Sequence, residues 1–398
     1  MGMKQSRLAL GCAVALSLVS ADLLMQQSAV AQESRYEQWK AEQKTKREAF
    51  YDAYMKRYAE YKAKVQAAWQ SEAELPTRSK FVDYSDDLSQ KIVVDYELGE
   101  IRIETLVDAN IEPNPQLVQQ TLDRLQQQSV ADTLAESELT AGIRTSNENK
   151  VLDTFAPNVT AADLASRVVE EEVVAVPVKT GATSTPATST TASNTDAEVT
   201  DASDKRIKRY RIRLTDDNIY QRRAQQYAPA IANFSTQFEV PQDLVFAITQ
   251  TESSFNPLAQ SPIPAFGLMQ IVPTSAGLDV NRLVFDLPNA PDEQVLFDPD
   301  SNIRMGTAYL HLLQTRYLRG ITDPVSRQYC VIAAYNTGAG NVASVFHPQG
   351  KRQIGPALKV INELTPEQVY QRLFTELPYE ETRNYLQKVT AVMPTYQG

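Results

Sequence analysis

Hydrophobic and polar residues follow a helical pattern at the start of the chain. From Glu33 to Glu74 there is no glycine or proline, and Lys, Glu, Gln, Ala and Tyr dominate. This composition predicts one long helix with charge on most of its faces. Aromatic residues recur mostly at steps of three to four and form a single stripe, which is typical of a docking face: Trp39, Phe50, Tyr54, Tyr58 and Tyr61.

A period of two residues replaces the helical period further on. Ile92, Val94 and Tyr96 alternate with their neighbours, Gly99 marks a turn, and alternation resumes from Ile101 to Thr105. This pattern predicts a β-hairpin. Asn114-Pro115 then opens a polar helix that reaches Leu125. We therefore expect a small α+β domain within residues 32–176.

Residues 177–203 are dominated by Thr, Ala, Ser and Val, which predicts a flexible loop or linker. Residues 204–214 then form a connecting strand in which apolar positions alternate with Arg209, Arg211 and Arg213. We interpret the arginines as protection of an edge strand, and an acidic partner is the alternative. If this strand pairs with the hairpin, Thr180–Asn194 becomes an insertion instead of a domain boundary.

Residues 215–398 have the pattern of helices separated by loops. Tyr227, Ile231 and Phe238 share a helical face with Phe234, and Pro241 suits the start of the next helix. Asp298 or Asp300 can cap a helix that continues to Tyr317. Further helices are expected at Ser326–Tyr335, Pro366–Phe374 and Tyr379–Val392. The fold class is therefore α+β overall, with an all-α domain after the small α+β domain.

The first 31 residues have the features of a signal peptide. Lys4 and Arg7 precede an apolar run from Leu8 to Val19, and Ala29-Val30-Ala31 fits a cleavage site. Val19-Ser20-Ala21 is an alternative site, and a buried N-terminal helix is the alternative to a signal. Export predicts a periplasmic protein. No other stretch reaches the ~18 apolar residues of a membrane-spanning helix.

Charge and cysteine usage exclude several classes of protein. The net charge of −10 argues against a nucleic-acid binder, which needs a basic face. Cys12 lies in the signal, so the mature chain keeps Cys330 alone and forms no internal disulfide. Lipid attachment at Cys12, with outer-membrane association, is the alternative to removal of the whole signal. His311 and His347 lack metal-ligand spacing, so no metal site is expected.

Glu252 interrupts an apolar helical face. It follows Leu244, Val245 and Ile248 by eight, seven and four residues, which places all four side chains on one side of a helix. An average helical glutamate is exposed, whereas burial here would favour the protonated form. A shift of the pKa from ~4.3 toward ~6–7 corresponds to roughly 3 kcal/mol. We therefore predict a carboxyl group that can donate a proton near neutral pH.

Two short motifs follow Glu252 in order. Pro262, Pro264 and Gly267 set an irregular path before Gln270, whose amide can donate and accept hydrogen bonds. Ala334-Tyr335-Asn336 lies at a helix end and supplies a flat ring and an amide, which suit N-acetylated sugars. Each motif is weak by itself.

Together, the ordered motifs Glu252-Ser253, Gly267–Gln270 and Ala334–Asn336 resemble the soluble-lytic-transglycosylase family, which is related in fold to goose-type lysozyme. The resemblance covers about Gln221 to Tyr396. Phe81–Tyr84 and Gly99–Thr105 are similar to the preceding domain of the membrane-bound lytic murein transglycosylase C subfamily. Three further segments also match that subfamily, the nearest of those considered: Thr251–Pro257, Phe297–Pro299 and Gly306–Leu310.

The resemblance implies a lysozyme-like catalytic domain and a role for each matching residue. Glu252 would be the catalytic acid and base, Met269 would support the groove wall, and Tyr385 would lie near the carboxylate. The residues implied to bind the saccharide in the groove are Ser261, Gln270, Tyr335 and Asn336. Two positions depart from the family pattern, Pro264 where glycine is usual and Val272 where methionine is frequent, and either could alter the groove.

The implied substrate is the glycan strand of peptidoglycan. Most glycosidases use two carboxylates, but Glu252 is the one strong candidate, because Asp279, Asp286 and Asp298 fit caps or turns. We therefore expect cleavage between N-acetylmuramic acid and N-acetylglucosamine with closure of a 1,6-anhydro ring. This reaction needs no metal, cofactor or water. A lysozyme-type hydrolase and a non-catalytic peptidoglycan-binding scaffold are the alternatives, and the sequence names no protein partner.

Overall fold

The computed structural model describes residues 37–39, 41–71, 73–108, 116–140, 143–175, 205–214 and 218–397. The predicted signal peptide with Cys12, and the predicted linker at 177–203, lie outside the described residues. The chain forms two compact units, residues 1–57 and residues 58–398. Each unit is considered by itself below.

The predicted N-terminal helix is present but ends early. Residues 41–57 are helical in the first unit, where Lys46 Nζ lies 2.7 Å from Glu42 Oε1 one turn away. In the second unit the helix continues to residue 69. The prediction that it extends to Glu74 is wrong, because Gln70 adopts a left-handed backbone conformation (φ 49°), which ends a helix.

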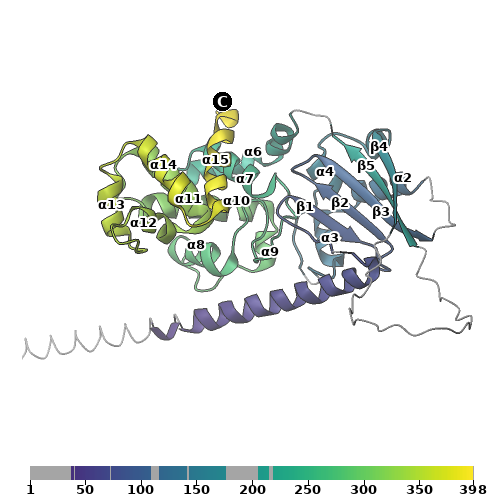
Figure 1. The fold of residues 1–398 in the computed structure, drawn as a ribbon, viewed down its shortest axis with the longest axis horizontal. Coiled ribbons are helices and arrows are strands. Elements are labelled where there is room, and N and C mark those ends of the chain that lie inside the picture. Colours follow the sequence, from purple (N-terminus) through teal and green to yellow (C-terminus); the bar gives the residue numbers. More distant parts are fainter. Residues whose placement is uncertain are drawn as a thin grey trace, which may run out of the picture. The chain divides into compact units, whose positions relative to one another are not determined.

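A five-stranded antiparallel sheet forms the core of the α+β domain (Figure 1), in the order β1-β2-β3-β5-β4. The strands are β1 (Lys80–Tyr84), β2 (Gln90–Asp95), β3 (Glu100–Asp108), β4 (Val168–Ala175) and β5 (Lys205–Arg213). The predicted hairpin is β2–β3, with Ile92 opposite Ile103 and a turn at Gly99 with φ 65°. Among the described residues, the sheet is accompanied by the helices α2 (Leu117–Gln127), α3 (Val130–Glu136), α4 (Val151–Phe155) and α5 (Ala161–Ala165).

The connecting strand β5 is interior to the sheet, so its interpretation as an edge strand is wrong. It pairs with β3 on one side and with β4 on the other. Its arginines have acidic neighbours within the chain: Arg209 Nε donates to Glu104 Oε1 at 2.7 Å, and Arg213 Nε lies 3.0 Å from Glu100 Oε2. The structure shows the alternative expectation, in which β5 pairs with the hairpin through its strand β3.

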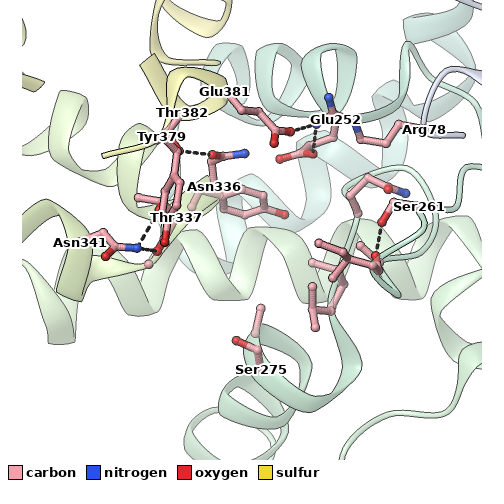
Figure 2. A pocket seen from close by; sticks show the side chains of 18 of the residues that line it. Arg78, Glu252, Ser261, Ser275, Asn336, Thr337, Asn341, Tyr379, Glu381 and Thr382 are labelled. Carbon is pink, nitrogen blue, oxygen red and sulfur yellow. Dashed lines mark hydrogen bonds and ion pairs between the residues drawn. The ribbon is translucent and has the colours of Figure 1, made fainter. Parts of the chain in front are cut away.

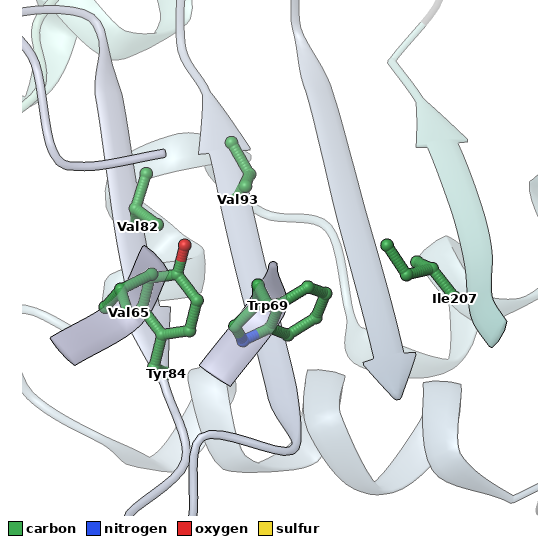
Figure 3. Packing of buried hydrophobic residues seen from close by; sticks show 6 residues of the cluster. All are labelled: Val65, Trp69, Val82, Tyr84, Val93 and Ile207. Carbon is green, nitrogen blue, oxygen red and sulfur yellow. The ribbon is translucent and has the colours of Figure 1, made fainter. Parts of the chain in front are cut away.

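The end of the long helix covers one face of this sheet (Figure 3). Val65 and Trp69 pack against Val82 and Tyr84 of β1, Val93 of β2 and Ile207 of β5. The Trp69 and Tyr84 rings meet edge to face at 5.8 Å, and Trp69 Nε1 donates to the Leu88 carbonyl at 2.8 Å. A pair of this kind adds about 0.5–1.5 kcal/mol to the burial of the two rings.

The remaining residues form the predicted all-α domain (Figure 1). Asp298 caps α10 by accepting from Ser301 N at 2.9 Å, and a π-helical turn, η2, continues that helix to Tyr317. The predicted fold class, α+β with an all-α domain, is confirmed. The longer helices are α6 (Ile219–Phe238), α7 (Gln242–Ser253), α10 (Pro299–Leu312), α11 (Pro324–Thr337), α14 (Pro366–Glu376) and α15 (Glu380–Val392). The shorter elements are η1 (Pro273–Gly277), α8 (Leu278–Leu283), α9 (Glu293–Leu296), η2 (Leu313–Tyr317), α12 (Ala339–Phe346), α13 (Ile354–Ile361) and η3 (Met393–Tyr396).

A fully buried arginine joins the all-α domain to the α+β domain. Arg223 in α6 donates to the carbonyls of Phe155 and Tyr96 at 2.7 and 2.5 Å, and its guanidinium lies 4.8 Å from the centre of the Phe155 ring. Close to this contact, Asn256 Nδ2 donates to the Arg78 carbonyl at 3.3 Å. The bond between Asn256 and Arg78 holds the segment before β1 against the end of α7.

None of the described helices is long and apolar enough to cross a membrane. Cys330, the one cysteine in the described part of the chain, is free and buried in α11.

Candidate active site

A cleft of about 1070 Å³ opens beside the C-terminal end of α7 (Figure 2). One wall is the loop that precedes η1, and the opposite wall is the end of α11 with the start of α15. The α+β domain contributes Thr77, Arg78 and Ser79. The cleft is therefore built from both domains.

Glu252 is the penultimate residue of α7 and lines this cleft. Leu244, Val245 and Ile248 on the same helical face are completely buried, and Glu252 itself is 5% exposed. Burial raises the pKa of Glu252 to about 7; Arg78 and the Tyr385 hydroxyl oppose this rise, and Glu381 adds to it. The predicted burial and raised pKa are confirmed. The carboxyl group can therefore both donate and accept a proton near neutral pH.

The two charged residues that lie beside Glu252 in the cleft were missed by the sequence reasoning. Arg78 Nη1 lies 3.2 Å from Glu381 Oε1 and 3.9 Å from Glu252 Oε2, so that the guanidinium lies between the two carboxylates (Figure 2). Glu381 had a signal, because it lies one helical turn before Tyr385 on the same face of α15. Arg78 had none, since only the packing of the two domains brings it to the cleft.

Tyr385 is buried behind Glu252 and does not line the cleft. Its hydroxyl lies close enough to the Glu252 carboxyl to lower the pKa of that group by hydrogen bonding, although no partner meets the full geometry of a hydrogen bond. Burial, and next the Glu252 charge, raise the pKa of Tyr385 well above its ordinary value. The hydroxyl therefore remains a neutral donor to the carboxylate.

Gln270 lines the cleft and has a buried side-chain oxygen without a hydrogen-bond partner. Its Nε2 donates to the carbonyls of Ala259 and Gly267 at 3.1 and 3.0 Å, and because both partners are acceptors, the amide orientation is determined. Its Oε1 is buried without a hydrogen-bond partner. Gln270 therefore offers an oriented acceptor that suits the N–H of an acetamido group.

The loop before Gln270 is held by close backbone contacts. Gly267 has φ 73°, and a Cβ at this position would lie 2.2 Å from the Leu296 carbonyl oxygen. Met269 is completely buried behind the cleft, where its N donates to Asn302 Oδ1 at 2.7 Å and its carbonyl accepts from the Tyr335 hydroxyl at 2.8 Å. Met269 thus supports the wall from behind.

Asn336 lies on the opposite wall with its amide held in place. Thr382 Oγ1 donates to Asn336 Oδ1 at 2.7 Å, and the Asn336 nitrogen points away from Thr382 toward Glu252 (Figure 2). Ser261 also lines the cleft, and its hydroxyl donates to the Ile263 carbonyl. The residues that line the cleft thus include an amide donor, from Asn336, and a buried, unpaired amide acceptor, from Gln270.

The structure brings four of the six predicted groove residues into one cleft with Glu252: Ser261, Gln270, Tyr335 and Asn336. Met269 and Tyr385 lie directly behind its surface. Residues that the sequence reasoning did not single out also line the cleft, and those nearest to the groups above are Thr77, Arg78, Ser79, Tyr309, Tyr379, Glu381 and Thr382.

Carboxylates elsewhere in the all-α domain have structural partners. Asp279 accepts from the Tyr317 hydroxyl at 2.8 Å, and Asp298 caps α10. Within the described ranges of the chain, the carboxylates that line the cleft are Glu252, Glu380 and Glu381. Glu252 is therefore the buried member of a group, and the description of it as a lone candidate is corrected. No cluster of three or more His, Cys, Asp or Glu that could hold a metal ion occurs among the described residues.

Comparisons with known proteins cover both domains. Residues 229–356 match the family model described as "Transglycosylase SLT domain", and residues 43–167 match "Membrane-bound lytic murein transglycosylase C, N-terminal domain". These two matches confirm the resemblance predicted from the motifs. The first match includes Glu252 and the four predicted groove residues that line the cleft, Ser261, Gln270, Tyr335 and Asn336.

Curated relatives are similar over a little less than half of the chain. One from Sodalis glossinidius, named membrane-bound lytic murein transglycosylase C, is 47% identical over 180 residues, which are 45% of this chain and 49% of the relative. One of the same name from Histophilus somni is 48% identical over 175 residues, 44% of this chain and 47% of the relative. The chain thus aligns with about half the length of these relatives.

Solved structures of lower overall similarity were also found. The 70 kDa soluble lytic transglycosylase from Escherichia coli is 27% identical, with a TM-score of 0.33 over 43% of this chain and 24% of that chain. A complex of the 70 kDa soluble lytic transglycosylase with bulgecin A has a TM-score of 0.35, with 27% identity over 45% of this chain and 25% of that chain.

Proposed function

We propose that this chain, which resembles lytic murein transglycosylases in both of its domains, is a peptidoglycan lytic transglycosylase. Its substrate would be the β-1,4 bond between N-acetylmuramic acid and N-acetylglucosamine, and its product a 1,6-anhydromuramoyl end. The observation that carries the proposal is a buried carboxyl group with a pKa of about 7, Glu252, at the surface of an open cleft. The match of residues 229–356 to the transglycosylase domain supports it.

Glu252 would act twice in this reaction. As an acid it gives its proton to the glycosidic oxygen, and the bond from that oxygen to C1 of the muramoyl unit breaks. The 2-acetamido oxygen of the same sugar assists at C1. Glu252, now a carboxylate, takes the proton of the C6 hydroxyl, whose oxygen bonds to C1 and closes the anhydro ring. The proton count balances, because Glu252 ends the cycle protonated.

The walls of the cleft are suited to holding the acetamido groups. Gln270 Oε1 is an unpaired acceptor for an N–H, and the Asn336 nitrogen is a donor for a carbonyl oxygen. The Tyr385 hydroxyl can donate to the Glu252 carboxylate in the half of the cycle in which that group is charged. Ser261 and Tyr335 complete the proposed saccharide groove, and Met269 supports it.

Hydrolysis is the second candidate, and Glu381 is the observation that favours it. A lysozyme-type reaction needs a carboxylate that activates water, and Glu381 lies in the cleft with 67% of its side chain exposed. Its ion pair with Arg78 occupies one of its oxygens, which is then not free to accept a proton from water. Transglycosylation is therefore the better supported reaction.

Mass analysis of digested sacculi separates the two reactions. The proposal expects products with 1,6-anhydro ends, each lighter by one water than the corresponding hydrolysis product, and their loss with Glu252→Gln. Products with reducing ends that disappear with Glu381→Gln would instead support the hydrolase. A folded, unmutated chain that releases no product would support a non-catalytic scaffold.

The site of action would be the periplasm, where peptidoglycan lies. The signal-like first 31 residues and the relatives named as membrane-bound support export and association with the envelope. Fractionation of cells that express the chain and a Cys12→Ala variant tests this location. Release of the variant alone from the membrane fraction would indicate lipid attachment at Cys12, and a cytoplasmic chain would contradict export.

A further inference from the structure

Arg78 reaches the cleft from a rigid turn in the α+β domain. Thr77 N donates to the Lys80 carbonyl at 3.0 Å, and Lys80 N donates to the Thr77 hydroxyl at 3.2 Å, which closes a turn around Arg78. The carbonyl of Arg78 accepts from the completely buried Asn256, three residues after Ser253. The backbone of Arg78 is thus fixed to both domains. Only its side chain is free to move between the carboxylates of Glu252 and Glu381.

The charged and titratable groups that face Glu252 come from three elements. Arg78 approaches it from the turn before β1, Glu381 and Tyr385 from α15, and Tyr335 from α11. Within the described part of the chain, Arg78 is the only cation at ion-pair distance from Glu252. It therefore stands alone in stabilising the charged form of that carboxyl group by direct attraction.

Glu381 draws Arg78 away from Glu252. The Arg78 Nη1 to Glu381 Oε1 distance is 3.2 Å, against 3.9 Å to Glu252 Oε2. Arg78 also has room to move, because it and Glu252 line a second cavity of about 270 Å³. The charges at the far side of that cavity, Lys388 and Glu97, pair with each other at 3.4 Å. They compete little for Arg78.

We propose that Arg78 is a positioning residue that divides its charge between Glu252 and Glu381, so that the α+β domain sets the proton affinity of the catalytic carboxyl group. The inference rests on the proposed function, in which Glu252 must be protonated to start the reaction. Glu381 then has a role without touching the reacting atoms. By holding Arg78 away from Glu252, Glu381 keeps Glu252 protonated up to a higher pH than it would be with Arg78 beside it.

This arrangement predicts opposite effects for two variants that each replace a charged side chain with a neutral amide. Arg78→Gln removes the attracting charge, so the pKa of Glu252 rises. Glu381→Gln removes a like charge and also releases Arg78 toward Glu252, so the pKa of Glu252 falls. Because Arg78 is 41% exposed and screened by solvent, each shift should be roughly 0.5 to 1 unit.

The pH profile of the cleavage rate on soluble glycan strands, measured with the full chain, tests the proposal. Activity falls as Glu252 loses its proton, which produces the alkaline limb of the profile. This limb should move to higher pH in Arg78→Gln and to lower pH in Glu381→Gln. At a pH well above the limb, the two variants should differ from the parent by roughly three- to tenfold in opposite directions. Arg78→Lys keeps the charge and should restore the parental limb.

Two control variants remove similar charges away from the cleft. Arg124→Gln breaks the pair between Arg124 and Asp83 in the α+β domain, and Glu376→Gln breaks the pair between Glu376 and Arg372 in α14. Neither residue lines the cleft, so both variants should keep the parental alkaline limb. A general effect of net charge would move the controls as well and would overturn the proposal.

Direct titration of Glu252 makes the result independent of catalysis. The carboxyl carbon resonance that is absent in Glu252→Gln reports the protonation of this group in each folded variant. Shifts of opposite sign in Arg78→Gln and Glu381→Gln support the proposal, and equal or absent shifts overturn it. If Arg78→Gln does not fold, a lowered pKa of Glu252 in Glu381→Gln together with a parental pKa in Arg78→Lys supports the proposal, and an unchanged pKa of Glu252 in Glu381→Gln overturns it. Failure of the proposed function appears separately, as an unmutated chain that titrates normally but releases no anhydro product.

Discussion

The Tyr335 hydroxyl donates a 2.8 Å hydrogen bond to the Met269 carbonyl and so ties the end of α11 to the loop that forms one wall of the cleft. Tyr335→Phe should leave this carbonyl without its donor and destabilise the fold by about 1–2 kcal/mol. The rate of sacculus digestion should fall as well, because Gln270 follows Met269 directly. Thermal unfolding and digestion assays measure both effects. Tyr379→Phe, at an exposed tyrosine on the same cleft, should leave stability unchanged.

Glu252→Gln should stabilise the protein, and the gain should grow with pH. The pKa of Glu252 is about 7 in the folded chain and about 4.3 in an unfolded one, so the folded state binds one more proton between these values. The stability of the parent therefore falls as pH rises through this range, by up to about 4 kcal/mol, and the glutamine variant escapes that loss. Denaturant unfolding at pH 4.5 and pH 8 tests this sign. A stability difference that does not change with pH would contradict it.

Gln270→Glu should weaken both the wall and substrate binding. The Gln270 nitrogen donates to two carbonyls, and a carboxylate oxygen in its place would face them as a third acceptor. We expect a loss of stability of about 1–3 kcal/mol and a loss of cleavage of at least roughly tenfold. Gln387→Glu, at an exposed position of α15, is the matched control. Equal behaviour of the two variants would show that the amide of Gln270 has no special role.

Gly306→Ala should destabilise the all-α domain through Met269. A Cβ at Gly306 in α10 would lie 2.3 Å from Met269 Sδ and 2.9 Å from Met269 Cβ, so the methionine must move. Overpacking of this kind costs about 1–3 kcal/mol. Gly355→Ala in α13, where a Cβ would meet nothing within 4 Å, should be neutral or stabilising. Differential scanning calorimetry of both variants makes the comparison, and equal melting temperatures would refute it.

Local patterns were enough to predict the hairpin and the buried face of α7. The period of two in residues 92–105 predicts paired strands, because side chains alternate across a sheet whatever surrounds it. The steps of four, seven and eight before Glu252 place it among apolar neighbours for an equally local reason. The order of the motifs along the chain then assigned Gln270 and Asn336 to the same predicted site as Glu252.

Patterns that depend on neighbours in space were misread. The alternating arginines of β5 suggested an edge strand, but the sheet places β4 outside it and Glu104 beside Arg209. The helix that ends at residue 69 has a favourable sequence for several residues more, and the backbone at Gln70 stops it. In both places tertiary packing outweighed a weak local preference.

The sequence by itself determined where the acid lies, because the burial of Glu252 follows from its spacing along one helix. The tertiary structure alone decided which charges surround it. Arg78 precedes Glu252 by more than 170 residues, and Glu381 follows it by more than 120. Their distances to the carboxyl group depend on how two domains pack, and the pKa of Glu252 depends on those distances as well as on burial, which is the largest effect.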